Sequence, residues 1–268
     1  VEQARKLATL TAPLLITGDT GTGKDLLAHA CHLASPRATK PYLALNCASI
    51  PEESVESELF GHAPEGKKGF CEQANGGSVL LDEIGEMSPR MQVKLLRFLN
   101  DGTFRRVGED HEVHVDVRVI CATQRNLVEL VQKGLFREDL YHRLAVVPVK
   151  VPALSERRED IPFLVDMFIR QISEQAGIRP RKIGDDAMAV LQTHDWPGNI
   201  RQLRNNIERL MILTRPEGGD TSITADMLPS DIGDMLPKIA AQGDQHIMTL
   251  PLREAREMFE RDYLVAQI

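Results

Sequence analysis

The stretch LLITGDTGTGKDLL, residues 14–27, places a glycine-rich turn that ends in lysine between an apolar run and a periodic helical run. Gly18, Gly23 and Lys24 match the pattern G-x-x-x-x-G-K, and a strand before it and a helix after it are the context that this pattern requires. Glycines allow a tight turn whose backbone N–H groups, with the helix N-terminus, face an anionic phosphate. The turn therefore predicts a nucleotide site in which Lys24 reaches the β- and γ-phosphates.

One position in this turn departs from the usual pattern. The residue after the lysine is normally Ser or Thr, whose hydroxyl contacts Mg²⁺, and here it is Asp25. A carboxylate can lie near magnesium but does not simply replace a hydroxyl. Taken alone, the segment therefore leaves open a glycine-rich strand-to-helix turn that binds no ligand.

A second acidic motif follows an apolar strand in GGSVLLDEIG, residues 76–85, where Asp82 and Glu83 stand at the carboxyl end. In an open parallel sheet, ligands bind beyond the carboxyl ends of the strands, so this pair is expected to face the phosphate turn. Asp82 is suited to holding Mg²⁺ through water, and Glu83 to orienting and polarising the attacking water. Alone the pair would read as a solvated loop start, but the two motifs together predict a site for ATP and Mg²⁺.

Short apolar runs alternate with helical runs over the first 150 residues. The predicted strands are 13–17, 42–46, 78–84, 117–123 and 145–151, and the predicted helices between them include 24–34 and 89–102. Near-continuous apolar strands separated by helices indicate an α/β fold with a parallel sheet covered on both faces. Residues 104–118 interrupt the alternation and predict a hairpin that turns through residues 108–110.

After Pro152 the strand-like runs end, and apolar residues at i, i+3 and i+4 predict three helices in residues 158–177, 184–195 and 198–214. A stretch rich in Gly, Asp and Pro then reads as a linker, and an amphipathic helical stretch ends the sequence. The expected organisation is an α/β nucleotide-binding subdomain over 1–153, a helical lid over 154–215, a linker over 216–249 and a helix over 250–268.

Composition narrows the class of protein. The net charge of −7 and the pI of about 5.7 argue against nucleic-acid reading by this chain itself, because such domains are usually basic. No run approaches the roughly 18–20 apolar residues that span a bilayer. The start VEQARKLATL carries no signal peptide, so we expect a cytoplasmic fragment of a longer protein. The cysteines are widely spaced and read as reduced core residues: Cys31, Cys47, Cys71 and Cys121.

Six segments of the chain, in this order, resemble the central AAA+ domain of bacterial enhancer-binding transcriptional activators, the class associated with sigma-54. They are GDTGTGKD, LNCASIPEESVESELFGH, GFCEQANGGSVLLDEIGEM, VDVRVICATQRNL, FREDLYHRL and WPGNIRQLRN, and they span nearly all of residues 1–215. That family commonly carries an acidic residue at the position of Asp25. Residues 1–143 are similar to tyrosine-responsive repressors of the family and residues after about 144 to its nitrogen-response regulators, so the chain is either a natural intermediate or a chimera.

The resemblance implies a role for each matching residue. The residues that would bind the nucleotide phosphates are Gly18, Asp19, Thr20, Gly21, Thr22, Gly23, Lys24 and Asp25. Asp82 and Glu83 would serve Mg²⁺ and hydrolysis, and Asn46 would restrain the catalytic Glu before activation. Thr123 and Gln124 occupy the first sensor position, where the family usually has Thr-Asn, so Gln124 is one methylene longer than the usual residue.

Three arginines also match family positions. Arg201, in GNIRQL, matches the second sensor that the helical lid presents to the nucleotide, and Arg137 and Arg143, in FREDLYHRL, match arginine fingers. A guanidinium delivered to the γ-phosphate stabilises the charge spread over the transferring oxygens. Such a finger acts across a subunit boundary and therefore requires an oligomeric ring. The alternative for the two finger residues is surface ion pairing with Glu138 or Asp139.

The contact loop of the family is missing from this chain. Activators that remodel sigma-54 carry the hexapeptide GAFTGA between the segments that correspond to ELFGH and GFCEQANGG. Here that span is APEGKK, Ala63–Lys68, which has no Phe-Thr and is too short to project from a ring pore. We therefore expect a switch in which nucleotide and effector control assembly, and assembly controls promoter occupancy. Substitution of the loop by the 104–118 hairpin is the alternative.

The leading hypothesis is an ATP-binding regulatory domain of a transcription factor, with weak ATPase activity or none. A ring ATPase that remodels sigma-54 RNA polymerase holoenzyme is the second hypothesis, and an AAA+ unfoldase, which would usually carry an aromatic pore loop, is a remote third. The implied partners are further copies of the chain in a ring or hexamer, with a dimer as the state without nucleotide, and RNA polymerase. DNA would be bound through a C-terminal helix-turn-helix whose first helix is LREAREMFERDYLVAQI, residues 252–268.

Overall fold

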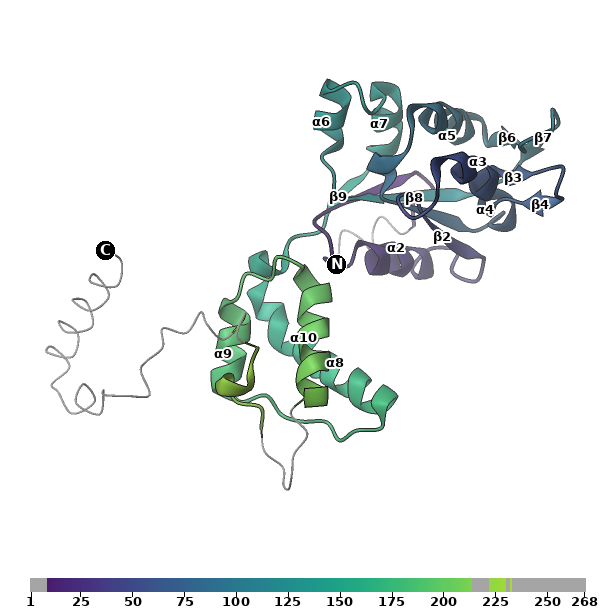
Figure 1. Ribbon diagram of the computed structural model, residues 1–268. Helices are drawn as coiled ribbons and strands as arrows, with labels where there is room; N and C mark the ends of the chain where they lie inside the picture. The colour runs from purple at the N-terminus through teal and green to yellow at the C-terminus, as the bar shows by residue number, and fades with distance from the viewer. Residues whose placement is uncertain (1–8, 214–221, 230–231, 233–268) are drawn as a thin grey trace, which may run out of the picture. The chain divides into compact units, whose positions relative to one another are not determined.

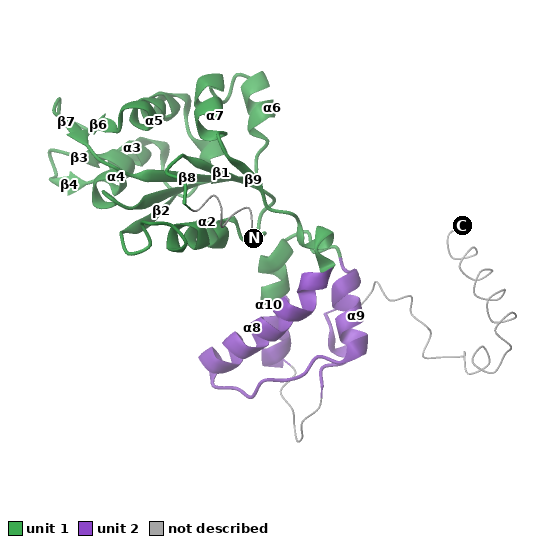
Figure 2. Ribbon diagram, turned by 180° about the vertical axis from the view of Figure 1, so that it is seen from behind, with its two compact units in different colours: residues 1–158, 195–205 green, residues 159–194, 206–268 purple. Residues whose placement is uncertain are grey.

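The computed structural model describes residues 9–213, 222–229 and 232. The chain divides into two compact units, residues 1–158 with 195–205 and residues 159–194 with 206–268 (Figure 2). The predicted subdomain bounds at 153 and 215 stay a prediction. Of the predicted linker over 216–249, only residues 222–229 and 232 are described, and the predicted helix over 250–268 lies outside the described residues.

A five-stranded parallel sheet forms the centre of the first unit. Its strands are β1 (Leu14–Thr17), β2 (Tyr42–Asn46), β5 (Ser78–Asp82), β8 (Arg118–Thr123) and β9 (Pro148–Lys150), in the order β2-β5-β8-β1-β9. Every neighbouring pair is parallel, which confirms the predicted α/β class. Because β1 lies between β8 and β9, the turn that follows it stands inside the edge formed by the carboxyl ends of the strands, next to the central strand β8.

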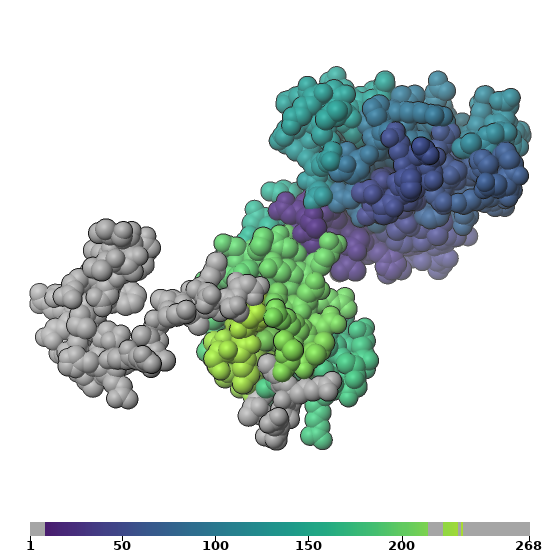
Figure 3. All heavy atoms as spheres, in the orientation of Figure 1, coloured from purple at the N-terminus to yellow at the C-terminus, as the bar shows by residue number. Residues whose placement is uncertain are grey.

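Helices cover both faces of this sheet (Figure 1). They are α2 (Lys24–Leu33) on one face, and α3 (Glu52–Phe60), α5 (Pro89–Asp101), α6 (Leu127–Gln132) and α7 (Glu138–Leu144) on the other, with the single turn α4 (Phe70–Gln73) beside α3. Successive strand side chains point to opposite faces, so Leu14 and Ile16 pack with α2 whereas Leu15 joins the larger core on the other side. The dark-blue residues around α3 are part of the surface turned to the viewer in Figure 3.

Two short hairpins lie at one end of the first unit (Figure 1). In one, β3 (Gly61–His62) pairs with β4 (Lys67–Lys68), and in the other, β6 (Thr103–Arg105) pairs with β7 (Glu112–His114). The second is the hairpin predicted over residues 104–118. The first contains the short span that stands where the family contact loop would be.

The second unit is helical, as predicted. Its helices are α8 (Ile161–Ala176), α9 (Asp185–Thr193) and the later turns of α10 (Asn199–Leu213). A short 3-10 turn, η3 (Arg158–Asp160), precedes α8, and another, η4 (Ala225–Met227), follows α10. Helix α8 has a proline in its first turn and ends at Gly177, whose φ is 64°. The first turn of a helix tolerates proline because a backbone N–H there would have no acceptor within the helix. Glycine adopts the left-handed conformation at the helix end without strain. Among the described residues, no helix is long and apolar enough to cross a membrane.

The four cysteines are free thiols buried in the first unit: Cys31, Cys47, Cys71 and Cys121. Burial raises the pKa of each thiol and takes that of Cys47 to about 12. The thiolate is the reactive form, so we expect iodoacetamide at pH 8 to alkylate the native chain at least ~100-fold more slowly than the chain in urea. Mass spectrometry over time measures this. Rapid labelling of one thiol in the native chain would contradict the prediction for that site.

A buried histidine makes the stability of the first unit depend on pH. His32 is 2% exposed, its Nδ1 lies 2.9 Å from Ser78 Oγ, and burial lowers its pKa below 6.5. Below about pH 6.5 the unfolded chain therefore takes up a proton before the folded chain does, and the free energy of unfolding falls; above that pH this contribution is constant. We expect His32→Gln to reduce the shift in urea midpoint between pH 7.5 and 5.5. Equal shifts in both chains would rule the effect out.

Candidate functional site

The turn after β1 is shaped by glycines that no other residue can replace. A Cβ on Gly21 would lie 2.3 Å from Gly198 O, and one on Gly18 would lie 2.7 Å from Val151 O. Gly21 and Gly23 also have φ values of 78° and 93°, in the left-handed region. The backbone of this loop is therefore tightly turned, and the predicted phosphate cradle stays a prediction.

Lys24 begins α2 and lies folded over this loop. It is 6% exposed, and its Nζ donates to Gly18 O at 2.9 Å and to Asp19 O at 3.1 Å. This places a positive charge at the helix N-terminus, where an anion is most strongly attracted. Asp25, the next residue, is exposed in the first turn of α2.

The acidic pair lies at the same edge of the sheet. Asp82 ends β5, and Asn46 at the end of β2 stands directly opposite it in the strand register. Asn46 Nδ2 donates to Asp82 Oδ2 at 3.4 Å, and Cys47 N donates to Asp82 O at 2.9 Å. The asparagine that the resemblance assigns to the catalytic Glu thus contacts Asp82, one residue before Glu83.

Glu83 and Gln124 are joined by a hydrogen bond, and Gln124 also bonds to the phosphate loop. Glu83 has the left-handed φ of 52°, which ends the strand and turns its side chain toward β8, and its Oε2 accepts from Gln124 N at 3.4 Å. Gln124 Oε1 in turn accepts from the Thr20 hydroxyl in the phosphate loop. Thr123 is fully buried, and its Oγ1 accepts from Arg125 N at 3.0 Å. Gln124 therefore connects the loop to the acidic edge.

Of the three predicted arginines, Arg201 lies beside the phosphate loop, and Arg137 and Arg143 lie at α7. The segment 195–205 belongs to the first unit, and there Arg201 N donates to Gly21 O at 3.3 Å, so the backbone of this residue lies beside the phosphate loop. Arg137, at the start of α7, donates from Nε and Nη2 to Asp139 at 3.0 and 2.7 Å, and Arg143 Nη2 donates to Leu99 O at 2.7 Å. The ion pair weighed as the alternative for Arg137 is thus present.

Two residues that the sequence did not single out also touch the loop. Asn199, 2% exposed with a φ of 52°, donates from Nδ2 to Thr20 O at 3.0 Å and accepts at Oδ1 from Leu154 N at 2.8 Å. Arg157 Nη2, just after the 3-10 turn η2 (Leu154–Glu156), donates to Thr22 O at 3.0 Å. The only local signal for Asn199 is its place after Pro-Gly, because Asn tolerates the left-handed turn conformation.

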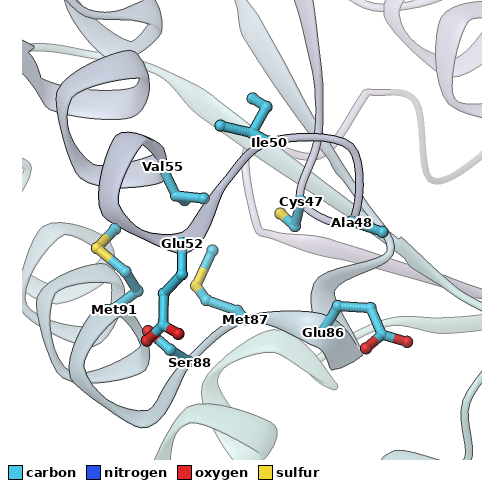
Figure 4. Close-up of a pocket in the computed structure, with 9 residues that line it drawn as sticks. All are labelled: Cys47, Ala48, Ile50, Glu52, Val55, Glu86, Met87, Ser88 and Met91. Atoms are coloured by element: carbon cyan, nitrogen blue, oxygen red, sulfur yellow. The ribbon is translucent and has the colours of Figure 1, made fainter.

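A pocket of about 250 Å³ opens beside the acidic edge (Figure 4). Its lining residues are Cys47, Ala48, Ile50, Glu52, Val55, Glu86, Met87, Ser88 and Met91. The loop after Asn46 forms one wall, and the 3-10 turn η1 (Ile84–Glu86), which directly follows Glu83, forms another. Figure 4 shows Glu86 directed away from Val55 and Met91; its carboxylate pairs with Arg125 at 2.7 Å.

The residues fit a nucleotide with Mg²⁺. Within the described ranges, no group of three or more His, Cys, Asp or Glu side chains converges as a metal site. A Mg²⁺ at this edge would therefore take Asp82 as its carboxylate ligand, and phosphate and water oxygens for the rest, which is how nucleotide sites commonly hold it. When bound, the ion would neutralise phosphate charge.

Comparisons with known proteins show the family of the chain. The family model for the sigma-54 interaction domain matches residues 1–150, and the model for the AAA+ ATPase lid domain matches residues 155–244. The HTH-type transcriptional regulatory protein TyrR from Citrobacter braakii is 64% identical over 264 residues, which cover 98% of this chain and 50% of that protein. The chain thus spans about half the length of this relative.

Two crystal structures of NtrX from Brucella abortus are similar over the whole chain. The complex with ADP is 55% identical with a TM-score of 0.86, the complex with ATP is 56% identical with a TM-score of 0.85, and this chain covers 60% of each. TyrR and NtrX both match the chain across residue 144, and the predicted junction there stays a prediction. The chain belongs to the sigma-54 interaction domain family of AAA+ ATPases, followed by an AAA+ lid domain.

Proposed function

We propose that the chain is the ATP-binding regulatory domain of a bacterial transcription factor, in which nucleotide-dependent self-association controls promoter occupancy. ATP binding is supported by the glycine-walled loop, by Lys24 above it, and by Asp82 and Glu83 at the same sheet edge. It is also supported by the ATP and ADP complexes of NtrX. The name of the family supports contact with RNA polymerase, and the HTH-type relative supports DNA binding by a longer chain.

The regulatory interpretation depends mainly on the hairpin at residues 61–68, which is hydrogen-bonded to the neighbouring hairpin. Ala63 N donates to Val107 O and Val107 N donates to Gly61 O, both at 2.9 Å, so the short hairpin is bonded to the loop of its neighbour. Arg106 then makes a bidentate ion pair with Glu72 of α4 at 3.0 Å for each bond. The two strands of this hairpin are two residues each, and the span has no Phe-Thr to contact a sigma factor.

The ring ATPase that remodels sigma-54 holoenzyme is the second candidate. It is favoured by Arg137, just before α7, and Arg143, within it. Their side chains donate to Asp139 and Leu99 on the opposite side of the sheet from α2, and not to the phosphate loop of their own chain. An arginine in such a place is available to a neighbouring subunit. The two candidates share the nucleotide site and differ in what the chain does after binding.

Two measurements distinguish the regulatory domain from the remodelling ATPase: the mass of the assembly and the opening of a sigma-54 promoter. We expect ATP with Mg²⁺ to raise the mass of the chain in mass photometry, and Lys24→Ala to remove the response because the lysine charge is lost. With the full-length protein, ATP should change operator affinity but should not open a sigma-54 promoter. Unchanged mass and operator affinity would overturn the regulatory reading, and ATP-dependent opening would establish the remodeller. If the chain binds ATP but releases phosphate only at the background rate, it is a domain that binds ATP without hydrolysing it.

A further inference from the structure

Three successive carbonyl groups of the phosphate loop are each held from outside the loop. Thr20 O accepts from Asn199 Nδ2 at 3.0 Å, Gly21 O accepts from Arg201 N at 3.3 Å, and Thr22 O accepts from Arg157 Nη2 at 3.0 Å. All of these residues belong to the first compact unit. The donors come from two segments more than 130 residues after the loop in sequence, one on each side of the helices α8 and α9.

The bonds constrain the direction in which the loop's peptide groups point. The peptide unit is planar, so a carbonyl that is held in place sets the plane that also carries the next residue's N–H. Thr22 N donates within the loop to Asp19 O at 3.4 Å, so the bonds to Thr20 O and Thr22 O, which set the N–H groups of Gly21 and Gly23, are the ones that matter for a ligand. Fixed N–H groups bind an anion without a further loss of backbone freedom, which is the advantage of a preorganised site. Because Gly21 and Gly23 leave the loop backbone unusually free, bonds from outside are needed to hold one conformation.

Asn199 also ties the loop to the segment that precedes α8. Its Oδ1 accepts from Leu154 N at 2.8 Å while its Nδ2 donates to the loop, so one buried amide bridges both. Its own backbone N donates to Trp196 O at 2.7 Å, and Trp196 is 1% exposed. The bridge is therefore anchored in packed structure.

Arg157 has a donor left over. Its Nε is buried and finds no hydrogen-bond acceptor among the described residues, while its Nη2 holds Thr22 O. A buried donor without an acceptor costs free energy. The bond from Nη2 to Thr22 O is therefore the contact through which this guanidinium holds the loop.

We propose that Asn199 and Arg157 are positioning residues that clamp the carbonyl side of the phosphate loop and hold its N–H groups ready for the nucleotide. The inference rests on the proposed nucleotide binding for its consequence, and on the three hydrogen bonds for its geometry. Through Asn199, the start of α10 would then act on the nucleotide site by way of the loop backbone, in addition to the role that the resemblance implies for the Arg201 side chain.

Hydrogen exchange in the nucleotide-free chain tests the clamp independently of ATP. Asn199→Asp keeps the acceptor for Leu154 N and loses the donor to Thr20 O, and Arg157→Gln removes the guanidinium. Each should accelerate exchange of the amides in residues 18–24 by about fivefold, the equivalent of one hydrogen bond, while exchange in β5 and β8 stays unchanged. Arg105→Gln is the control for charge, since Arg105 Nη2 pairs with Glu112 at 3.0 Å in the exposed hairpin of β6 and β7.

ADP titration then tests the consequence. The two clamp variants should raise the Kd for ADP by about fivefold or more, with urea midpoints near that of the wild type, and Arg105→Gln should bind as the wild type does. A general loss of structure would instead accelerate exchange across the sheet, and Arg157→Lys, which keeps the charge, then serves as the milder variant. Loop exchange and ADP affinity within twofold of the wild type would overturn the clamp. A wild-type chain that binds no ADP would overturn the proposed function, while loop exchange still decides the clamp.

Discussion

Replacing Arg137 by alanine is expected to lower ATP turnover by about 10³-fold while leaving the ATP affinity of the chain within about threefold. The guanidinium bonds to Asp139 in the first turn of α7, whereas the phosphate loop leads into α2 on the other face of the sheet. In its own chain it therefore adds little to binding, but a neighbouring subunit could receive it at the γ-phosphate. Phosphate release against protein concentration and ATP titration measure the two quantities.

Mixing two inactive chains provides the matched control for Arg137. Lys24→Ala keeps the finger and loses the nucleotide site, whereas Arg137→Ala keeps the site and loses the finger. If the finger acts on a neighbour, a mixture of the two should regain turnover that neither has alone. Asp139→Asn, which releases Arg137 from its ion pair, should retain turnover. Equal losses of affinity and turnover in Arg137→Ala, with no recovery on mixing, would show that the arginine acts within its own chain.

The fold follows closely from local sequence patterns, and the differences have local causes. Runs such as SVLLD are buried on both faces, so their apolar, β-branched character is sufficient to predict a central strand. The predicted strand 78–84 ends at Asp82 because Glu83 adopts a left-handed φ of 52° and a 3-10 turn follows. The last predicted strand, 145–151, is shorter in the structure, Pro148–Lys150. It lies at the sheet edge, where only one neighbouring strand, β1, provides backbone hydrogen bonds.

The site was predictable where a motif is contiguous and unpredictable where it depends on register or on distant segments. The loop residues and the Asp82–Glu83 pair are each read from one short stretch. The contact between Asn46 and Asp82 depends instead on β2 and β5 pairing these two residues directly. Asn199 and Arg157 reach the loop only through tertiary structure, and no spacing in the sequence relates them to Thr20 or Thr22.

Replacing Glu83 by glutamine is expected to preserve ATP binding and to lower phosphate release by about 10²- to 10⁴-fold, the usual contribution of a general base. The amide has nearly the shape of the carboxylate, and its oxygen can still accept from Gln124 N, which Glu83 contacts at 3.4 Å. The left-handed turn at this residue is a property of the backbone and need not change. What is lost is the capacity to accept a proton from the attacking water.

Glu86→Gln is the matched control for Glu83→Gln, because it removes a carboxylate three residues further on that pairs with Arg125 at 2.7 Å. We expect the control to retain turnover within about threefold, since this pair is partly exposed to solvent and contributes little. The comparison uses phosphate release at saturating ATP, with ADP titration to confirm that both variants bind nucleotide. Full turnover in Glu83→Gln would remove the acidic pair from the chemistry and leave Asp82 a binding role alone. Equal losses in both variants would assign the effect to the net charge of the edge and not to one base.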